Sequence, residues 1–157
     1  MLAFTTKGFK QRSVYTLLLF LVSCTNDLVK VPSVGLKRVT VVAQKDANNS
    51  SVTTVHLVFP KTDDVYTTLN KMDAIAYFAA FRDLLASFPN DLEIVVIEAV
   101  PGLSVTEKIC LKDFASKAVI VFASYDQSIP GTHRETLRTL CKQVSISLGR
   151  NSFTVSY

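Results

Sequence analysis

The chain has 157 residues, of which 48% are hydrophobic and 19% are charged. This composition is too apolar for a disordered chain, and the length suits a single domain with its own core. The net charge is +4, from 17 basic and 13 acidic residues, but Lys7, Lys10 and Arg12 precede the first acidic residue and leave 14 against 13 for the rest. The sequence shows no clustered excess of Lys and Arg, which excludes an evident nucleic-acid-binding face and predicts no nucleic-acid partner.

The N-terminal segment has the pattern of an export signal that ends in a cysteine. A short cationic stretch is followed by an uncharged apolar run, residues 14–22, and then by Cys24. The run is too short to span a membrane, which takes ~20 residues, although it also fits an N-terminal helix of a soluble domain. The pattern resembles a bacterial lipobox, whose cysteine is acylated and becomes the new N-terminus. We expect 1–23 to be a removed lipoprotein signal peptide, Cys24 to carry lipid, and 24–35 to form a tether.

The first predicted elements after the tether are two strands and a helix. Residues 37–44 are rich in β-branched side chains, and residues 52–59 alternate until Pro60, with Val55, Leu57 and Phe59 on one face. A helix is predicted at about 73–87, with Asp73 as its N-cap and Pro89 after its end. Its apolar stripe is expected to pack on a sheet and comprises Ile75, Phe78, Ala79, Arg82 and Leu85, widened by Phe81, Leu84 and Phe88.

The remaining segments favour strands. Residues 91–100 and 105–111 flank a Pro-Gly turn, and 118–125 is almost continuously apolar, as in a central strand. Residues 132–143 fit a strand or a helix equally well, and 144–157 predict a terminal hairpin. This order predicts a mainly β fold, a β-sandwich of about seven or eight strands with one inserted amphipathic helix.

The sequence offers little chemistry. It contains no GxSxG, HExxH or CxxC motif and no glycine-rich phosphate loop. His56 lies in a strand and His133 in a loop, and a set of Ser104, Asp126 and His133 is too easily assembled by chance to indicate a hydrolase. We therefore expect no enzymatic activity, no metal site, and no cofactor other than the lipid on Cys24.

Two cysteines remain once Cys24 is set aside. An exported chain permits a disulfide between Cys110 and Cys141. The alternative is two isolated thiols that behave as small apolar side chains. Neither has a histidine or second cysteine at metal-ligand spacing.

Several segments, taken in order, resemble the TssJ family, the outer-membrane lipoproteins of bacterial type VI secretion systems. The lipobox at Cys24 is followed by the strand 53–59 (TTVHLVF) and by the helix 72–85 (MDAIAYFAAFRDLL) with its trailing aspartate. The strand 118–126 (AVIVFASYD) is similar to an aliphatic family strand that ends in a small residue, an aromatic and an aspartate. The resemblance covers most of residues 36–157.

The resemblance implies a transthyretin-like β-sandwich over 36–157 and a non-enzymatic outer-membrane anchor that faces the periplasm in a trans-envelope complex. It also implies a partner, the inner-membrane-anchored protein TssM, and membership of a multi-subunit ring. The implied docking element is the first inter-strand loop, which by position comprises Lys45, Asp46, Ala47, Asn48, Asn49, Ser50, Ser51 and Val52.

Two alternatives stay open at this point. The loop composition also fits an ordinary solvent-exposed hairpin connection. The chain also fits a periplasmic ligand-binding lipoprotein, or an assembly lipoprotein of another secretion system. A ligand binder should contain a formed apolar pocket, whereas an anchor should have a filled sandwich and an exposed loop at one end.

Overall fold

A computed structural model describes residues 35–111, 116, 118–137 and 141–157. The expected signal peptide and Cys24 lie outside these residues. Within the described ranges the chain forms eight strands, two α-helices and a short 3-10 turn. They are β1 (Arg38–Ala43), η1 (Ala47–Ser50), β2 (Thr53–Pro60), α1 (Asp63–Asn70), α2 (Ala74–Ser87), β3 (Leu92–Ala99), β4 (Ser104–Lys108), β5 (Val119–Ser124), β6 (Arg134–Leu137), β7 (Gln143–Leu148) and β8 (Phe153–Ser156).

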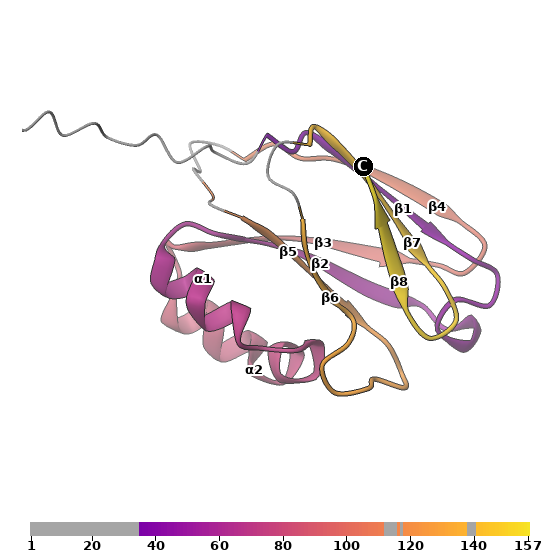
Figure 1. Ribbon diagram of the computed structural model, residues 1–157, viewed down its shortest axis with the longest axis horizontal. Coiled ribbons are helices and arrows are strands. Elements are labelled where there is room, and N and C mark those ends of the chain that lie inside the picture. The colour runs from indigo at the N-terminus through magenta and orange to yellow at the C-terminus, as the bar shows by residue number, and fades with distance from the viewer. Residues whose placement is uncertain (1–34, 112–115, 117, 138–140) are drawn as a thin grey trace, which may run out of the picture.

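The strands form two four-stranded sheets, which confirms the predicted sandwich. Sheet A has the order β4-β1-β7-β8, and sheet B has the order β3-β2-β5-β6. All pairings are antiparallel except that of β1 with β7, which is parallel. Both helices lie against the outer side of sheet B, so the molecule has three layers (Figure 1). The outer face of sheet A carries no helix among the described residues.

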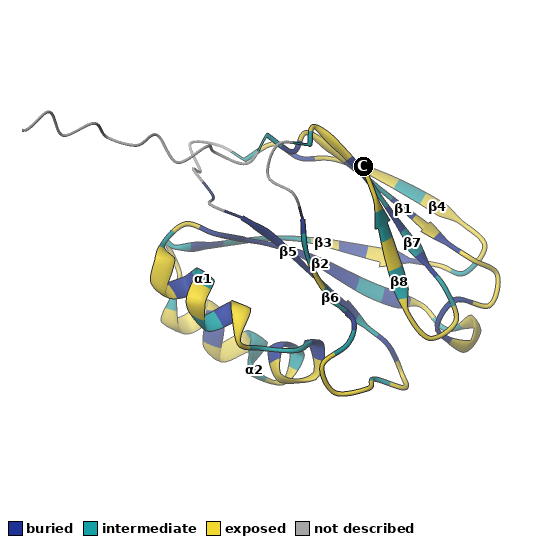
Figure 2. Cartoon of the chain, viewed as in Figure 1, coloured by how far each residue is buried: buried dark blue, intermediate teal, exposed yellow. Residues whose placement is uncertain are grey.

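One hydrophobic core fills the space between the two sheets. Val55, Leu57 and Phe59 of β2 point into it, as their alternation predicts. A second core lies between sheet B and the helices, where Val58 and Phe122 meet Tyr77 of α2. Strands β2 and β5 are therefore buried on both faces (Figure 2), which explains why the sequence of β5 is almost continuously apolar.

The helical layer contains two helices where the sequence predicted one. Helix α1 was missed because it is short and contains two β-branched threonines, which favour other conformations. Its start does carry signals: the Thr62 hydroxyl accepts a hydrogen bond from the Val65 N–H at 3.5 Å, and Asp63 and Asp64 follow in the first turn. Helix α2 has the predicted bounds and cap, since Asp73 Oδ1 accepts from the Ala76 N–H at 2.8 Å.

The buried face of α2 differs from the predicted stripe. Ile75 and Leu85 are exposed, while Ala74, Tyr77 and Leu84 are the fully buried positions. The helix is apolar on more than one side, so helical spacing alone did not single out the face that packs on the sheet. The ambiguous segment 132–143 begins with strand β6, which pairs with β5.

Both cores, as far as the structure describes them, are built from Leu36 onward. Among the described residues, neither helix has the length and apolarity that a membrane-crossing helix requires.

Candidate docking surface at one end of the sandwich

Four connections meet at one end of the sandwich: the β1–β2 loop, the β3–β4 turn at 100–103, the β5–β6 loop at 125–133 and the β7–β8 turn at 149–152 (Figure 1). Backbone hydrogen bonds join them. The Gly102 N–H donates to the Ala43 carbonyl at 2.9 Å, and the Asn48 N–H donates to the Gly149 carbonyl at 3.2 Å. Gly102 has φ +80°, a conformation in which glycine is favoured. The predicted docking loop is thus one part of a joined rim.

The β1–β2 loop is held in an unusual backbone conformation. Three successive residues have positive φ: Asn48 at 48°, Asn49 at 54° and Ser50 at 66°. Left-handed residues other than glycine each cost on the order of 1 kcal/mol, and asparagine tolerates the region best. The Asn-Asn pair is therefore suited to this turn, and the turn persists because surrounding contacts fix it.

Asn48 supplies most of those contacts. Its side chain is 1% exposed; the Oδ1 atom accepts from the Asp126 N–H at 2.8 Å, and the Nδ2 group donates to the Val52 carbonyl at 3.3 Å. A single side chain thus closes the loop on itself and fastens it to the β5–β6 connection. The docking loop implied by the resemblance includes Asn48, but in the structure this side chain is buried and its polar groups are hydrogen-bonded within the domain.

The surface that the loop presents is mixed in character. Lys45, Asp46, Asn49 and Val52 are exposed, whereas Ala47 is fully buried with Asn48. The Arg150 Nε–H donates to Asn49 Oδ1 at 3.2 Å and joins the loop to the β7–β8 turn.

Exposed apolar side chains surround these polar groups. Val52 is 50% exposed and Leu103, on the neighbouring β3–β4 turn, is 59% exposed. Val100 and Ile129 are also exposed on the same set of connections. Apolar side chains bordered by hydrogen-bonding groups are what a protein–protein interface requires.

A buried aromatic pair on the β5–β6 loop holds the β7–β8 turn in place. The rings of Tyr125 and His133 stack with centroids 4.3 Å apart. The Tyr125 hydroxyl donates to the Ser152 carbonyl at 2.8 Å, and the His133 Nε2–H donates to the Asn151 carbonyl at 2.7 Å. Burial raises the pKa of Tyr125 to about 12, so the hydroxyl stays protonated. Both hydrogen bonds fix the β7–β8 turn from the β5–β6 side.

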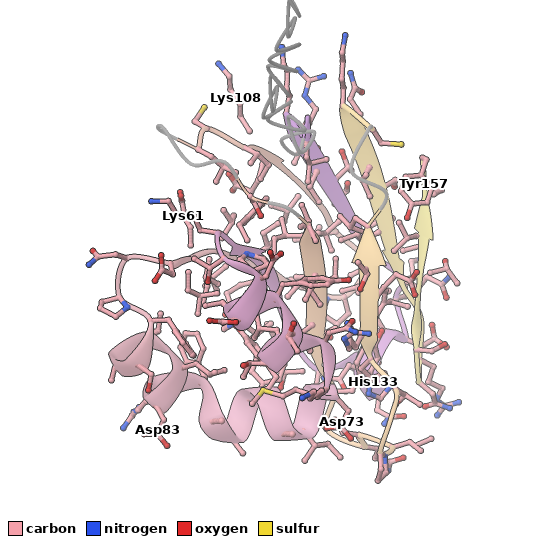
Figure 3. The ribbon with its side chains drawn as sticks, turned by 60° about the vertical axis from the view of Figure 1, so that its left-hand side comes forward. Lys61, Asp73, Asp83, Lys108, His133 and Tyr157 are labelled. Carbon is pink, nitrogen blue, oxygen red and sulfur yellow. The ribbon has the colours of Figure 1, made fainter. Side chains whose placement is uncertain are left out.

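Asp73 extends the support to the helical layer. While Oδ1 caps α2, Oδ2 accepts from the Gly131 N–H of the β5–β6 loop at 2.9 Å. The backbone N–H groups of Ala76 and Gly131 hold the pKa of Asp73 below its usual value. Figure 3 shows Asp73 and His133 at the same end of the molecule, opposite Lys108.

Both histidines have structural partners. His133 binds the β7–β8 turn, and His56 Nδ1 lies 3.0 Å from the Tyr77 hydroxyl inside the helix–sheet core. The part of the chain that the structure describes contains no cluster of His, Cys, Asp or Glu that could hold a metal ion.

The disulfide considered from the sequence is not formed in the structure. Cys110 is an exposed free thiol after β4, and Cys141 is a half-buried free thiol before β7. Strand β1 lies between β4 and β7. Just before β1, the Lys37 carbonyl accepts a hydrogen bond from the Ile109 N–H on one side, and the Lys37 N–H donates to the Lys142 carbonyl on the other. Two strand spacings amount to ~9.5 Å, more than the ~7 Å that a disulfide bridges between Cα atoms.

Comparison with known proteins finds similarity in structure but not in sequence. No protein-family model matches the sequence, and no curated protein matches it either. The fold resembles the T6SS lipoprotein TssJ1 from Pseudomonas aeruginosa, with a TM-score of 0.59 and 19% identity over 77% of this chain and 95% of that one. It also resembles Serratia marcescens Lip, a membrane-bound component of the type VI secretion system, with a TM-score of 0.54 and 16% identity over 81% of this chain and 99% of that one.

A third match is a chain from the structure of the T6SS protein TssM C-terminal domain from EAEC. The TM-score is 0.58 and the identity 18%, over 77% of this chain and 97% of that one. These matches nearly span the full length of the known chains, so the similarity covers the whole domain. The chain therefore has a TssJ-like fold, as its sequence pattern led us to expect.

Proposed function

We propose that this chain is a non-enzymatic lipoprotein of a type VI secretion membrane complex. In this proposal Cys24 carries the lipid that anchors it to the outer membrane, and the domain lies in the periplasm. The β1–β2 loop docks on the periplasmic part of a TssM-type inner-membrane protein, within a multi-subunit ring. The fold shared with TssJ1 and Lip supports the assignment to this machine.

The observation that carries the docking hypothesis is the fixed left-handed turn at 48–50. Backbone strain that internal contacts hold in place is characteristic of binding sites. A loop that is already ordered loses less conformational entropy when it binds a partner. The turn presents Asp46, Asn49 and Val52 from a rigid base. A solvent-exposed hairpin connection would gain nothing from this strain.

The docking hypothesis is tested with a triple variant of exposed loop residues. Asp46→Ala, Asn49→Gly and Val52→Ser remove side chains at the surface, and glycine at position 49 keeps the positive φ. We expect binding to the purified periplasmic domain of the TssM-type partner to weaken by about tenfold or more, because central interface side chains carry most of the binding energy. Isothermal titration calorimetry measures the change.

A matched triple variant on α2 and the α1–α2 connection provides the control. Lys71→Ala, Arg82→Ala and Asp83→Ala also remove three exposed side chains, but on the helical layer. This control should bind as the native chain does. Equal affinity of the loop variant and the native chain would remove the docking hypothesis.

A further inference from the structure

The described strand side chains on the outer face of sheet A are mostly polar and include no carboxylate. The register of its strands places eleven side chains on this face, and none of them is buried. They are Ser104, Thr106 and Lys108 of β4, Arg38, Thr40 and Val42 of β1, Gln143, Ser145 and Ser147 of β7, and Thr154 and Ser156 of β8. Seven carry hydroxyl groups, two are cationic and none is acidic.

The two cations on this face are placed directly opposite each other. Arg38 and Lys108 are register partners across the β1–β4 pair, an arrangement in which like charges destabilise a sheet. The other neighbour of Arg38 is the neutral Gln143 on β7. The acidic residue Glu107 is in register with the buried Val39 and so belongs to the other side of β4. None of the eleven side chains on the face is an acid that could offset this repulsion, whereas an anion bound there would offset it.

Two more cations stand at the same strand ends. Lys37 and Lys142 are exposed and are joined by a hydrogen bond from the Lys37 N–H to the Lys142 carbonyl at 2.8 Å. The four cations come from three segments far apart in sequence, which is why the sequence shows no basic cluster.

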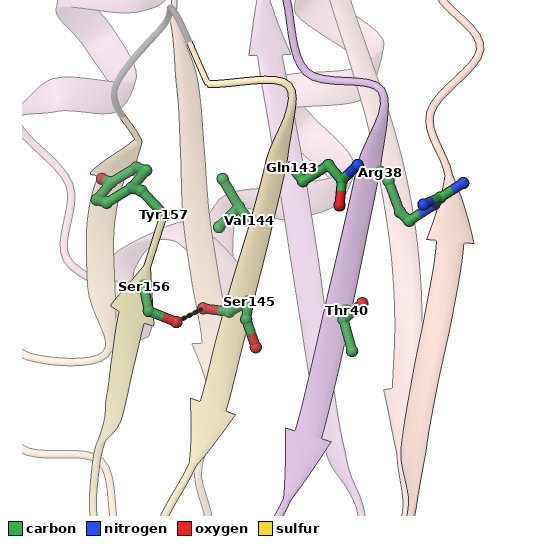
Figure 4. A pocket seen from close by; sticks show the side chains of 7 residues that line it. All are labelled: Arg38, Thr40, Gln143, Val144, Ser145, Ser156 and Tyr157. Atoms are coloured by element: carbon green, nitrogen blue, oxygen red, sulfur yellow. Dashed lines mark hydrogen bonds between the residues drawn. The ribbon is translucent and has the colours of Figure 1, made fainter.

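A groove lies beside the cationic pair. It has a volume of about 230 Å³ and is lined by Arg38, Gln143 and Tyr157 at one end and by Thr40, Ser145 and Ser156 below them (Figure 4). A guanidinium next to hydroxyl groups binds phosphate oxygens, since it offers a fork of N–H donors and the hydroxyls add further ones. A partly exposed tyrosine suits the border between water and lipid.

The position of this face in the chain identifies its occupant. The strand that carries Arg38 is the first of the domain, and Lys37 follows Cys24 by thirteen residues. Even fully extended, that stretch spans no more than ~45 Å. A lipid on Cys24 therefore keeps the cationic end within reach of the bilayer, while the docking loop lies at the opposite end (Figure 3).

We propose that this cationic end of sheet A binds the anionic phospholipid headgroups of the membrane in which the chain is anchored. The contact orients the domain, so that the β1–β2 loop points away from the lipid and towards its partner. The inference rests on the proposed anchoring for its geometry, but the binding itself depends only on the residues named.

A fragment of residues 35–157, which holds every described strand and helix, allows a test without the lipid once cooperative urea unfolding has shown that it folds. We expect this fragment to bind vesicles containing phosphatidylglycerol and not vesicles of phosphatidylcholine alone, with binding lost at high salt. Arg38→Gln with Lys108→Gln should weaken binding about 25-fold, at about fivefold for each basic residue. The same variant should melt at the native temperature or above it, because the cross-strand repulsion is removed.

A control variant with Lys71→Gln and Arg82→Gln loses the same net charge, but its substitutions lie in the helical layer. We expect it to bind vesicles as the native fragment does. Equal weakening by this control, or equal binding to both kinds of vesicle, would overturn the proposal. So would tight binding of inorganic phosphate or heparin at the same residues, which would assign the face to a soluble anion. Because the fragment lacks Cys24, these results are independent of whether that residue is acylated.

Discussion

At the scale of single residues, His56 of β2 and Tyr77 of α2 form a polar contact between sheet B and the helical layer. His56 points from β2 into the helix–sheet core, where Phe78 and Phe81 lie within 5.0 Å of its ring centre. The His56 ring is hydrogen-bonded to the Tyr77 hydroxyl, and the Tyr77 ring stacks on Phe122 with centroids 4.0 Å apart. Burial lowers the pKa of His56, an effect that the Glu98 carboxylate partly offsets. The neutral imidazole is therefore the form that the fold stabilises.

This pKa shift makes stability depend on pH in a defined direction. Since the pKa of His56 is lower in the folded state, its contribution is complete above the ordinary value of about 6.5 and is lost as the pH falls through the folded value. We expect denaturant unfolding to show stability falling between neutral pH and pH ~5, with up to about 1.4 kcal/mol per pH unit due to this group.

A pair of variants isolates the histidine. His56→Gln should flatten the slope in that pH range, whereas Tyr77→Phe should lower stability by about 1–3 kcal/mol through the lost hydrogen bond and keep the slope. An unchanged slope in His56→Gln would show that other groups cause the acid sensitivity.

At the scale of elements, the β1–β2 loop owes its shape to one side chain. Asn48 both tolerates the left-handed backbone and makes the two hydrogen bonds that tie the loop down. Substitution at this position can therefore separate the backbone cost from the hydrogen-bond cost.

We expect Asn48→Gly to lower the free energy of unfolding by about 1–3 kcal/mol, since the Asp126 N–H loses its partner while glycine keeps the positive φ. Asn48→Ala should cost about 1 kcal/mol more, because alanine adds left-handed strain. Asn90→Ala, an exposed asparagine in the α2–β3 connection, should change stability by less than about 0.5 kcal/mol. Urea unfolding measures all three, and equal losses for alanine and glycine would contradict the role of the backbone.

The elements also show what the sequence can and cannot predict. Strong alternation located β2 with its inward face, and the continuous apolar run located β5 as a central strand. What was missed depends on tertiary contacts. The Asn48 side chain is buried because it accepts a hydrogen bond from the Asp126 N–H. The cationic face forms because the register of β1, β4 and β7 brings its basic residues together. Neither relation has a local sequence signal, because each joins residues more than 60 positions apart.

At the scale of the whole molecule, the two proposals assign different tasks to the two ends of the domain. The chain leads into β1 at the cationic end, and the β1–β2 loop lies at the other, so β1 connects the proposed lipid contact to the proposed docking surface. All described core residues lie at Leu36 or later, and we expect the domain to fold whether or not Cys24 is acylated. Anchoring and folding should therefore be separable.

Cys24→Ser in the full chain tests this separation. Without the thiol, acylation cannot occur, and we expect the leader 1–23 to remain attached and the protein to be absent from the outer-membrane fraction of a density gradient. Intact mass spectrometry and incorporation of a labelled fatty acid measure processing and acylation. The domain should keep its protease resistance. A processed, outer-membrane-located Cys24→Ser protein would contradict the lipid anchor.

The parallel pairing of β1 with β7 has a consequence for the order in which the chain assembles. Strand β1 emerges first from the ribosome or the export channel, but the strand that flanks it on one side begins only at Gln143. Sheet A therefore cannot close until nearly the whole chain is present, and closing so large a loop is slow. Under the proposed export, this delay would keep the chain unfolded while it crosses the inner membrane.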